Sequence, residues 1–376
     1  MKSLNRLKKL SAWLRKENIE AAFITSPDNI FYLTGFRSEP HERLLGLVVF
    51  QEEEPFIICP AMEKADARAA GWEHEIIGYQ DTDQPWDFIE QAVKARISNI
   101  RQWAVEKNHM NVSRYEELQS RFSSISLQDV EPVLNELRML KTAQELEYIQ
   151  KACELADFAV EVGVSEIAEG KTELDIIAAI EYEVKKKGVS SMSFDTMVLT
   201  GINAASPHGT PGMTKIKKGD FVLFDLGVIY EGYCSDITRT VAFGEVSVDQ
   251  EKIYQTVLQA QEAAVNAVKP GILAKQLDKI ARDQITNAGY GEYFPHRLGH
   301  GLGISVHEYP SITATNPLRM TEGMVFTIEP GIYVPSIAGV RIEDDLLVTK
   351  EGVETLTKYP KSLQIIEACC LNGIFK

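Results

Sequence analysis

The feature that most constrains the fold of this 376-residue chain is a helical pattern that occurs twice. Gly170 and Gly188 bracket the first copy, and Gly271 and Gly289 bracket the second copy at an offset of 101 residues. The apolar residues between the glycines keep i, i+4 spacing and also align, as Ile176, Ile180 and Val184 with Leu277, Ala281 and Ile285. This repeat indicates that one structural unit is duplicated, with a chance match of spacing as the alternative.

Each copy is followed by a pair of notable residues seven positions apart, and at least one residue of each pair is a histidine. Gly201 precedes His208 by seven residues, and His300 precedes His307 by seven. Two related halves that face each other would bring these histidines to one central cleft.

The hydrophobic pattern divides the chain into two expected domains. The first, residues 1–133, alternates strand-like runs such as 21–26 and 44–50 with helical patterns, which is typical of an α/β domain. The second, residues 134–376, opens on a long helical pattern over 143–168 and then mixes helix pairs with strands. The predicted fold class is therefore α+β, with an N-terminal α/β domain before a domain that contains the duplicated helices.

Composition narrows the classes of function. The net charge is −15 and the pI about 5.1, which disfavours a nucleic-acid partner because such binding requires clustered Lys and Arg. No run reaches the roughly 18 apolar residues of a membrane span, and the N-terminus lacks the apolar core of a signal peptide. The five cysteines are scattered without a CxxC pair. We expect a soluble cytoplasmic protein with neither a nucleic-acid nor a membrane partner.

The strongest local signal is the segment 222–240, VLFDLGVIYEGYCSDITRT, in which two apolar strands flank a Glu-Gly turn. A two-residue turn pairs Asp225 with Thr238, and Asp236 shares a face with Thr238 because side chains alternate along a strand. Asp225 and Asp236 are then diagonal neighbours, about 7–8 Å apart. Two carboxylates in this apolar context need a cation between them, whereas a solvated sheet face is the alternative.

Three later segments add candidate ligands. His296, His300 and His307 lie among glycines in HRLGHGLGISVHEYP, where His296 could serve only to support the others. Glu329 lies in an apolar strand before Pro-Gly, and a buried glutamate must meet a cation or a proton. Glu343 follows an apolar stretch, and for this residue alone an internal ion pair is the alternative.

Together these residues make a set of four carboxylates and one imidazole: Asp225, Asp236, Glu329, Glu343 and His300. Such a set suits two divalent ions, whose charge balances the four carboxylates. We expect two ions per subunit, with Mn preferred and Co or Zn as alternatives. Two metals about 3.5–4 Å apart convert a water into a hydroxide nucleophile at neutral pH.

Four segments, FDLGVIYEGYCSDITRT, HRLGHGLGISVHE, GMVFTIEPGIY and GVRIEDDLLVT, resemble the signature of the pita-bread metallopeptidases. This family contains prolidase, aminopeptidase P and methionine aminopeptidase, with creatinase as a metal-free relative. The resemblance covers about 134–368, and the first domain is similar to the N-terminal domain of prolidase, aminopeptidase P and creatinase. It implies that the second domain has duplicated helices on a curved antiparallel sheet.

The resemblance also implies roles for the metal ligands. Asp236 and Glu343 match the residues that bridge the two metals. Asp225 completes one metal site, whereas His300 and Glu329 complete the other. Glu329 also matches the carboxylate that handles the proton of the attacking water.

Two further histidines and a substrate class follow from the resemblance. His208 and His307 match the residues that hold the substrate and stabilise the tetrahedral intermediate. The implied reaction is hydrolysis of the Xaa-Pro bond in dipeptides, and the alternative is an Xaa-Pro aminopeptidase that acts on longer peptides. A dipeptidase needs a cation for the proline carboxylate, for which Arg319 and Arg341 are the candidates. Arg341 could instead orient Glu343.

The resemblance also implies a homodimer, and it draws attention to the loop FRSEPHERL at residues 36–44. In related dimers this loop reaches the cleft of the neighbouring subunit, so His41 or Arg37 is predicted to contact substrate across the interface. A surface turn around Pro40 is the alternative.

Two other classes of function would require a different set of residues. A creatinase-like enzyme that works without metal and a binding module without activity would both predict that metal ligands are lost. None of the five is lost, so the sequence favours a metal-dependent peptidase.

Overall fold

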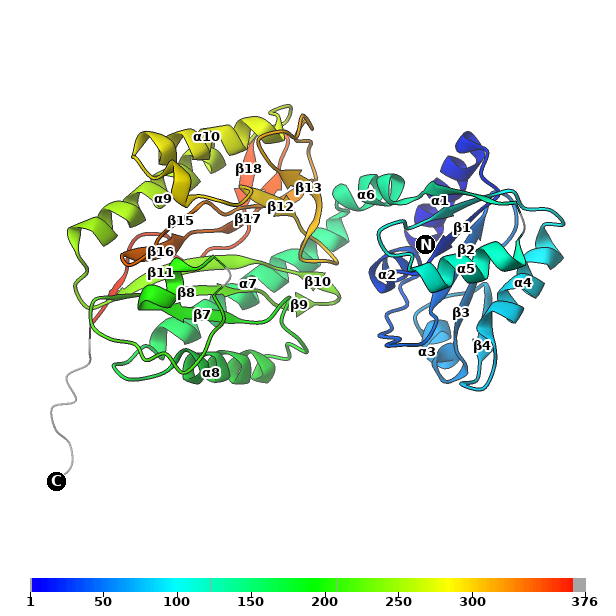
Figure 1. Cartoon of the computed structure of the whole chain (residues 1–376), viewed down its shortest axis with the longest axis horizontal. Helices are drawn as coiled ribbons and strands as arrows, with labels where there is room; N and C mark the ends of the chain where they lie inside the picture. The colour runs from blue at the N-terminus through cyan, green and yellow to red at the C-terminus, as the bar shows by residue number, and fades with distance from the viewer. Residues whose placement is uncertain (1, 123, 208, 368–376) are drawn as a thin grey trace, which may run out of the picture. The chain divides into compact units, whose positions relative to one another are not determined.

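The computed structural model describes residues 2–122, 124–207 and 209–367. The chain divides into two compact units, Met1–Arg138 and Met139–Lys376 (Figure 1). This division confirms the expected two-domain architecture of mixed α and β content. The predicted boundary after residue 133 falls inside helix α6 (Glu131–Met139) and stays a prediction. In the described part of the chain, no helix is both long and apolar enough to cross a membrane.

The first unit is built on one six-stranded sheet, which confirms the predicted α/β class. Its strand order is β4-β3-β2-β1-β5-β6, and three of its five pairings are parallel, namely β3 with β4, β1 with β5 and β5 with β6. The strands are β1 (Ala21–Ile24), β2 (Gly46–Phe50), β3 (Phe56–Pro60), β4 (Glu75–Tyr79), β5 (Gln102–Val105) and β6 (Ser126–Asp129).

Helices complete the first unit. Leu7, Leu10 and Leu14 form the buried stripe of the first helix, as its i, i+3, i+4 spacing predicts. Trp86 and Ile89 bury the matching face of a later helix against the sheet. The helices are α1 (Lys2–Glu17), α2 (Pro27–Thr34), α3 (Lys64–Ala69), α4 (Pro85–Arg96) and α5 (Val112–Arg121), followed by α6.

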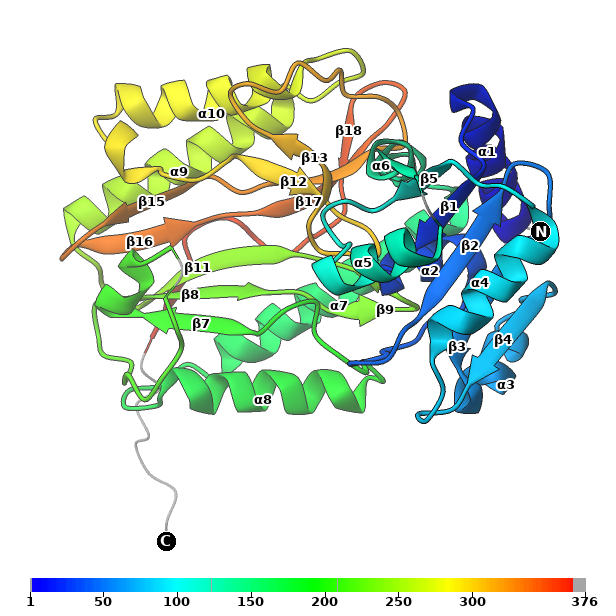
Figure 2. The same cartoon turned by 45° about the vertical axis from the view of Figure 1, so that its right-hand side comes forward.

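The second unit contains two halves, each with a helix pair on its own set of strands (Figure 2). In the first half, the four-stranded sheet has the order β19-β11-β8-β7, and Phe224 and Val241 belong to the core that it shares with the helices. Its helices are α7 (Ala143–Ser165) and α8 (Glu173–Lys186). Its strands are β7 (Met197–Thr200), β8 (Asp220–Leu226), β11 (Ile237–Phe243) and β19 (Ile365–Ile366), and the small ribbon β9 (Ile229–Tyr230) and β10 (Tyr233–Cys234) extends the hairpin.

The second half carries a five-stranded sheet in the order β13-β12-β14-β17-β18. Phe326 and Leu346 lie in the core that this sheet shares with its helices. The helices are α9 (Val248–Asn266) and α10 (Ala274–Asn287). The strands are β12 (Gly299–Gly301), β13 (Glu308–Ile312), β14 (Val325–Ile328), β17 (Asp344–Val348) and β18 (Val353–Thr355), with a separate hairpin of β15 (Gly331–Val334) and β16 (Ala338–Arg341).

The repeat seen in the sequence is confirmed in the structure. Gly170 and Gly271 have φ of 84° and 89°, and Gly188 and Gly289 both have φ of 90°. These left-handed conformations explain why glycine recurs at the same offset, because other residues rarely adopt them. The six aligned apolar side chains are all buried at 1% exposure or less: Ile176, Ile180, Val184, Leu277, Ala281 and Ile285.

Gly299 on β12 illustrates how closely the backbones pack in the second half. A Cβ atom at this position would lie 2.0 Å from the carbonyl oxygen of Thr327 on β14. We expect Gly299→Ala to lower the free energy of unfolding by about 3 kcal/mol, because the two strands must separate to admit a methyl group. Thermal denaturation measures the effect, and Gly212→Ala is the control because nothing lies within 4 Å of its Cβ position. Equal melting temperatures for the two variants would contradict the expectation.

Candidate metal centre

The hairpin that carries Asp225 and Asp236 has the register that the sequence predicts. Asp225 pairs with Thr238 between β8 and β11, and Tyr230 pairs with Tyr233 at the turn. The two turn residues, glutamate and glycine, have φ of 50° and 84°, as a type I′ turn requires. The hairpin therefore presents both aspartates to one pocket.

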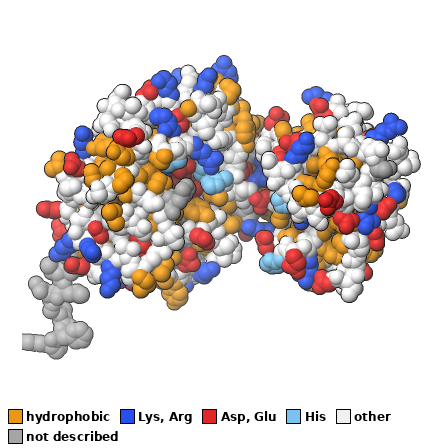
Figure 3. Space-filling model, in the orientation of Figure 1, with side chains coloured by type: hydrophobic (Ala, Val, Ile, Leu, Met, Phe, Trp, Pro, Cys, Tyr) orange, Lys and Arg blue, Asp and Glu red, His pale blue; other side chains and the backbone are white. Residues whose placement is uncertain are grey.

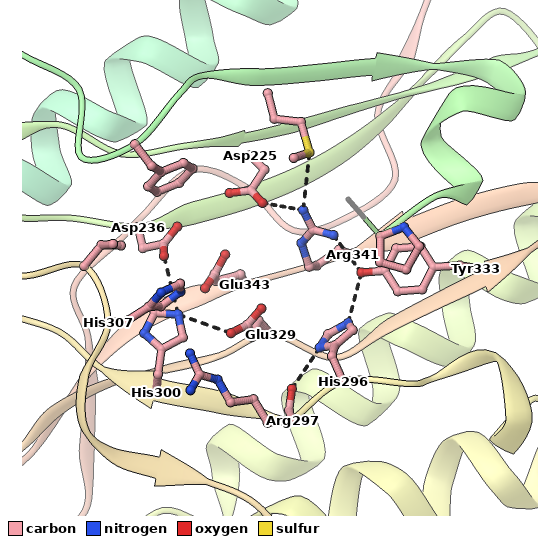
Figure 4. Close-up of a pocket in the computed structure, with 14 residues that line it drawn as sticks. Asp225, Asp236, His296, Arg297, His300, His307, Glu329, Tyr333, Arg341 and Glu343 are labelled. Atoms are coloured by element: carbon pink, nitrogen blue, oxygen red, sulfur yellow. Dashed lines mark hydrogen bonds and ion pairs between the residues drawn. The ribbon is translucent and has the colours of Figure 1, made fainter. Parts of the chain in front are cut away.

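The other three predicted ligands come from the second half of the unit. His300 lies on β12, Glu329 directly follows β14, and Glu343 lies between β16 and β17. All three line the same pocket of about 410 Å³ as the two aspartates. The structure thus brings the five predicted ligands together from segments spread between residues 225 and 343 (Figure 4).

Three of the five side chains are close enough to hold one ion. Asp236, His300 and Glu343 each offer a ligand atom, and these atoms all lie within 4.8 Å of one another. The Nε2 atom of His300 lies 3.3 Å from Oε1 of Glu329 and 3.6 Å from Oδ2 of Asp236. Figure 4 shows these groups converging on one point.

The carboxylates of this cluster fit a cation. Oδ1 of Asp236 and Oε1 of Glu343 are buried and have no hydrogen-bond partner among the described residues. Burial, and then the charges of neighbouring carboxylates, raise the pKa of both groups well above the usual range. Burial also raises the pKa of Glu329 to about 8. Such groups become favourable only when they meet a positive charge or a proton.

The histidine of the cluster is suited to the same purpose. Burial, together with the positive charge of Arg297, lowers the pKa of His300 to about 4. Its imidazole is therefore neutral at physiological pH, which is the form that binds metals. The backbone N–H of His300 donates to Oγ1 of Thr327 at 3.2 Å, which fixes the residue on β12.

Arg341 lines the pocket but is already fully engaged. Its guanidinium donates to the carboxylate of Asp225, to Oη of Tyr333 at 2.6 Å and to Oγ1 of Thr238 at 3.2 Å. Its side chain is only 5% exposed. These contacts hold Asp225 directly and reach Glu343 only through Thr238, which donates to Oε2 of Glu343. Both predicted roles of Arg341, to orient Glu343 and to contact substrate, stay predictions.

The remaining predicted residues have different positions. His307 is an exposed residue that lines the pocket, and its ring lies edge-on to His300 with the centroids 4.3 Å apart. Arg319 is exposed, does not line this pocket, and donates to the carbonyl of Gly271 at 3.0 Å. His208 lies outside the described residues.

His41 and Arg37 belong to the first unit. His41 is exposed and has φ of 53°, and the guanidinium of Arg37 lies 5.8 Å from the ring centroid of Phe31. Their predicted contact with substrate across a dimer interface stays a prediction.

The sequence interpretation missed two polar residues of the pocket, Arg297 and Tyr333. Oη of Tyr333 lies 3.0 Å from Nε2 of His296 and accepts from Arg341. The guanidinium of Arg297 makes no hydrogen bond or ion pair with the residues that the structure describes, although it lines the pocket. In Figure 3, histidine, acidic and basic side chains gather on one part of the second unit. A basic residue inside the glycine-rich histidine segment was the signal that could have identified Arg297.

The fold and the acidic cluster define a metallopeptidase class, and comparison with known families agrees. The sequence pattern of Metallopeptidase family M24 matches residues 147–350, and that of the Creatinase/Prolidase N-terminal domain matches residues 6–140. The chain belongs to metallopeptidase family M24. This confirms the pita-bread resemblance drawn from the four sequence segments.

Known relatives match the chain along almost its whole length. YkvY from Bacillus subtilis (strain 168), which is provisionally named a dipeptidase, is 55% identical over 96% of this chain and 100% of that protein. A recombinant prolidase from Thermococcus sibiricus has a TM-score of 0.92 at 37% identity, covering 97% of this chain and 100% of that chain. The X-Pro aminopeptidase from Thermotoga maritima MSB8 has a TM-score of 0.83 at 32% identity, covering 94% and 100%.

Proposed function

We propose that this protein is a dinuclear Xaa-Pro dipeptidase, a prolidase that hydrolyses the bond before proline in dipeptides. The observation that carries the proposal is the convergence of four carboxylates and one neutral imidazole on a single pocket. The prolidase from Thermococcus sibiricus and the dipeptidase name of YkvY support the substrate class. The X-Pro aminopeptidase relative keeps longer peptides as the second candidate.

The residues of the pocket fit two divalent ions, for which Mn is the proposed metal and Co or Zn the alternatives. Asp236 and Glu343 would hold both ions, Asp225 would complete one site, and His300 and Glu329 would complete the other. When bound, such ions activate a water and polarise the substrate carbonyl. The unpartnered oxygens of Asp236 and Glu343 support this assignment.

Side chains around the ions handle the proton and the substrate. We assign Glu329 to take the proton from the attacking water and to pass it to the proline nitrogen that leaves. The ring of His307 lines the pocket beside His300, where its N–H can donate to the oxygen that gains negative charge. His208 is assigned the partner role by resemblance.

The pocket also has an apolar wall that suits proline. The side chains of Phe194, Met197, Pro207 and Val306 line it together with the polar groups. The bond before proline has no N–H group, so a site that reads the ring rather than the backbone is required. This apolar wall supports proline as the residue that leaves.

Arg297 is the proposed receptor for the carboxylate of the dipeptide, in place of the Arg319 candidate. We expect Arg297→Gln to lower kcat/KM for Ala-Pro by about 10- to 100-fold, since a hydrogen bond to a charged group contributes about 1.5–3 kcal/mol. The effect on Ala-prolinamide, which lacks the carboxylate, should be small. Arg319→Gln is the control, because Arg319 is exposed and does not line the pocket. An equal loss on Ala-Pro and its amide would assign Arg297 another role.

A peptide panel tests the proposed function itself. The Mn-loaded enzyme is expected to cleave Ala-Pro and to be inactive after chelation, with activity restored by Mn. Cleavage of Ala-Pro-Ala but not of Ala-Pro would replace the dipeptidase with the aminopeptidase. If neither peptide is cleaved under any of the three metals, the proposed function is wrong.

Three properties of the whole molecule belong to the same proposal. We propose a homodimer in which the first unit contributes to dimerisation and to substrate access through His41 or Arg37. The cytoplasmic location stays an expectation from composition. Light scattering of the purified protein tests the dimer, since a monomeric mass would contradict it.

A further inference from the structure

The candidate metal ligands come from the two halves of the second unit, each of which has its own sheet. The boundary between these halves, where β11 faces the segment that carries Glu343, passes through the site and is called the seam below. Asp225 and Asp236 belong to the β8–β11 hairpin, whereas Glu343 precedes β17 in the other half. No strand pairing joins β11 to β17 among the described strands, so other contacts must set the width of the seam. That width fixes the distance between Asp236 and Glu343.

On the face toward the pocket, the seam is held by Thr238. Its Oγ1 donates to Oε2 of Glu343 at 2.6 Å, and its carbonyl accepts from the backbone N–H of Glu343 at 3.1 Å. Two residues later, and on the same face of the strand, Oγ1 of Thr240 donates to the carbonyl of Arg341 at 3.1 Å. These contacts tie β11 to the segment that carries Glu343.

On the opposite face, Arg239 crosses the same seam. It is 1% exposed and follows Thr238, so its side chain points away from the pocket. Its guanidinium donates to the carbonyls of Thr238 and Glu343, to Oδ1 of Asp344 at 2.7 Å, and twice to the carbonyl of Tyr359, at 2.7 and 3.0 Å. These contacts use all five N–H groups that an arginine carries.

Asp344, which accepts from Arg239, accepts three further hydrogen bonds. Asp344 is 0% exposed and accepts from Thr357 at 2.9 Å, from Gln261 at 2.8 Å and from Lys361 at 2.7 Å. Gln261 lies on α9, so the cluster anchors the seam to a helix of the second half. These hydrogen bonds therefore hold Asp344, the residue directly after Glu343, in place.

We propose that Arg239 is a positioning residue that sets the spacing of the two metal ions by clamping β11 to the Glu343 segment. This inference rests on the proposed dinuclear site. The clamp acts at the backbone of Glu343, which is the residue assigned to hold both ions, while the hairpin on the other side of the seam carries Asp236. A shift of this seam changes the separation of the two bridging carboxylates and weakens the binding of the second ion first.

Lysine cannot replace arginine in this clamp. Its single ammonium carries three donors at one point, whereas the contacts of Arg239 are spread over a planar fork. Arg239→Lys keeps the positive charge beside Asp344 but loses the bond geometry that spans the seam. Lys361→Met is the matched control, because it removes a charge from the same cluster and leaves all five Arg239 contacts in place.

The test is Mn²⁺ binding to the chelator-treated full-length protein, measured by calorimetry and by the EPR spectrum of the bound ions. Wild type and Lys361→Met should bind two ions per chain and show the spectrum of a coupled Mn pair. Arg239→Lys should bind the first ion with little change and the second about 10- to 100-fold more weakly, with the coupled spectrum reduced. Melting temperatures without metal report how far each variant is destabilised.

The outcomes separate the clamp from a general role in stability. If Arg239→Lys and Lys361→Met lose similar stability but bind both ions like wild type, Arg239 only stabilises the fold and the inference is overturned. If wild type itself binds fewer than two ions, the dinuclear site of the proposed function fails, and the clamp fails with it. A selective loss of the second ion in Arg239→Lys supports the inference.

Discussion

Asp236→Asn is expected to reduce turnover of Ala-Pro by more than about 100-fold, because even changes to groups that only contact metal ligands cost about 10–100-fold. The same change is expected to raise the melting temperature of the metal-free protein. Burial and the neighbouring charges of Glu343 and Asp225 raise the pKa of Asp236 well above its usual range, so its carboxylate opposes folding at neutral pH. Asparagine has the same shape and no charge, so it removes this repulsion.

Once metal is bound, wild type should become more stable than Asp236→Asn. In wild type, Mn²⁺ stabilises the folded state by mass action and raises the melting temperature, whereas Asp236→Asn should show little increase. The control is Asp220→Asn on β8, whose carboxylate accepts from Thr200 and from the backbone of Lys217 and does not line the pocket. A full metal-dependent increase in Asp236→Asn, together with retained turnover, would remove Asp236 from the metal centre.

The second large effect is a fall in the stability of the metal-free protein as pH rises from 6.5 to 8. The pKa of Glu329 is raised from 4.5 to about 8, so the folded state holds a proton there that the unfolded state has released. Folding that binds extra protons becomes less favourable as pH increases. Asp236 and Glu343, whose pKa values are raised in the same direction, add to this fall.

The histidines act in the opposite direction at lower pH. The pKa values of His300 and His307 are lowered from 6.5 to about 4, so they make the folded state more stable as pH rises through that range. Above pH 6.5 they are neutral in both states, which leaves the carboxyl groups of the pocket as the dominant contribution. Chemical denaturation at several pH values measures the slope. Glu329→Gln should reduce it and saturating Mn²⁺ should abolish it, whereas a flat or rising profile for the metal-free wild type would contradict the account.

Local rules explain why much of this architecture could be predicted from the sequence. The Glu-Gly turn fixes the register of the hairpin, and the register fixes that Asp225 and Asp236 face the same way. The positive φ of Gly170 and Gly271 explains the recurring glycines of the repeat. In both cases the spacing of residues along the chain was sufficient, because each turn or helix end has a local residue requirement.

Contacts between distant segments could not be predicted in the same way. Arg319 was a candidate because of its place before a motif strand, but its side chain donates to Gly271 and does not line the pocket. Arg341 and Arg297 both belong to the motif segments. Only the three-dimensional contacts show that the guanidinium of Arg341 is hydrogen-bonded, whereas that of Arg297 makes no hydrogen bond or ion pair with the described residues. The Arg239 cluster depends on Gln261 and Tyr359, which no sequence spacing connects to the hairpin.

The most direct test of the metal centre is anomalous X-ray diffraction from crystals soaked in Mn²⁺, with data collected at the manganese absorption edge. A dinuclear centre should give two anomalous peaks per chain, about 3.5–4 Å apart, with Asp236 and Glu343 in contact with both. A single peak, or peaks outside the pocket that contains His300, would contradict it.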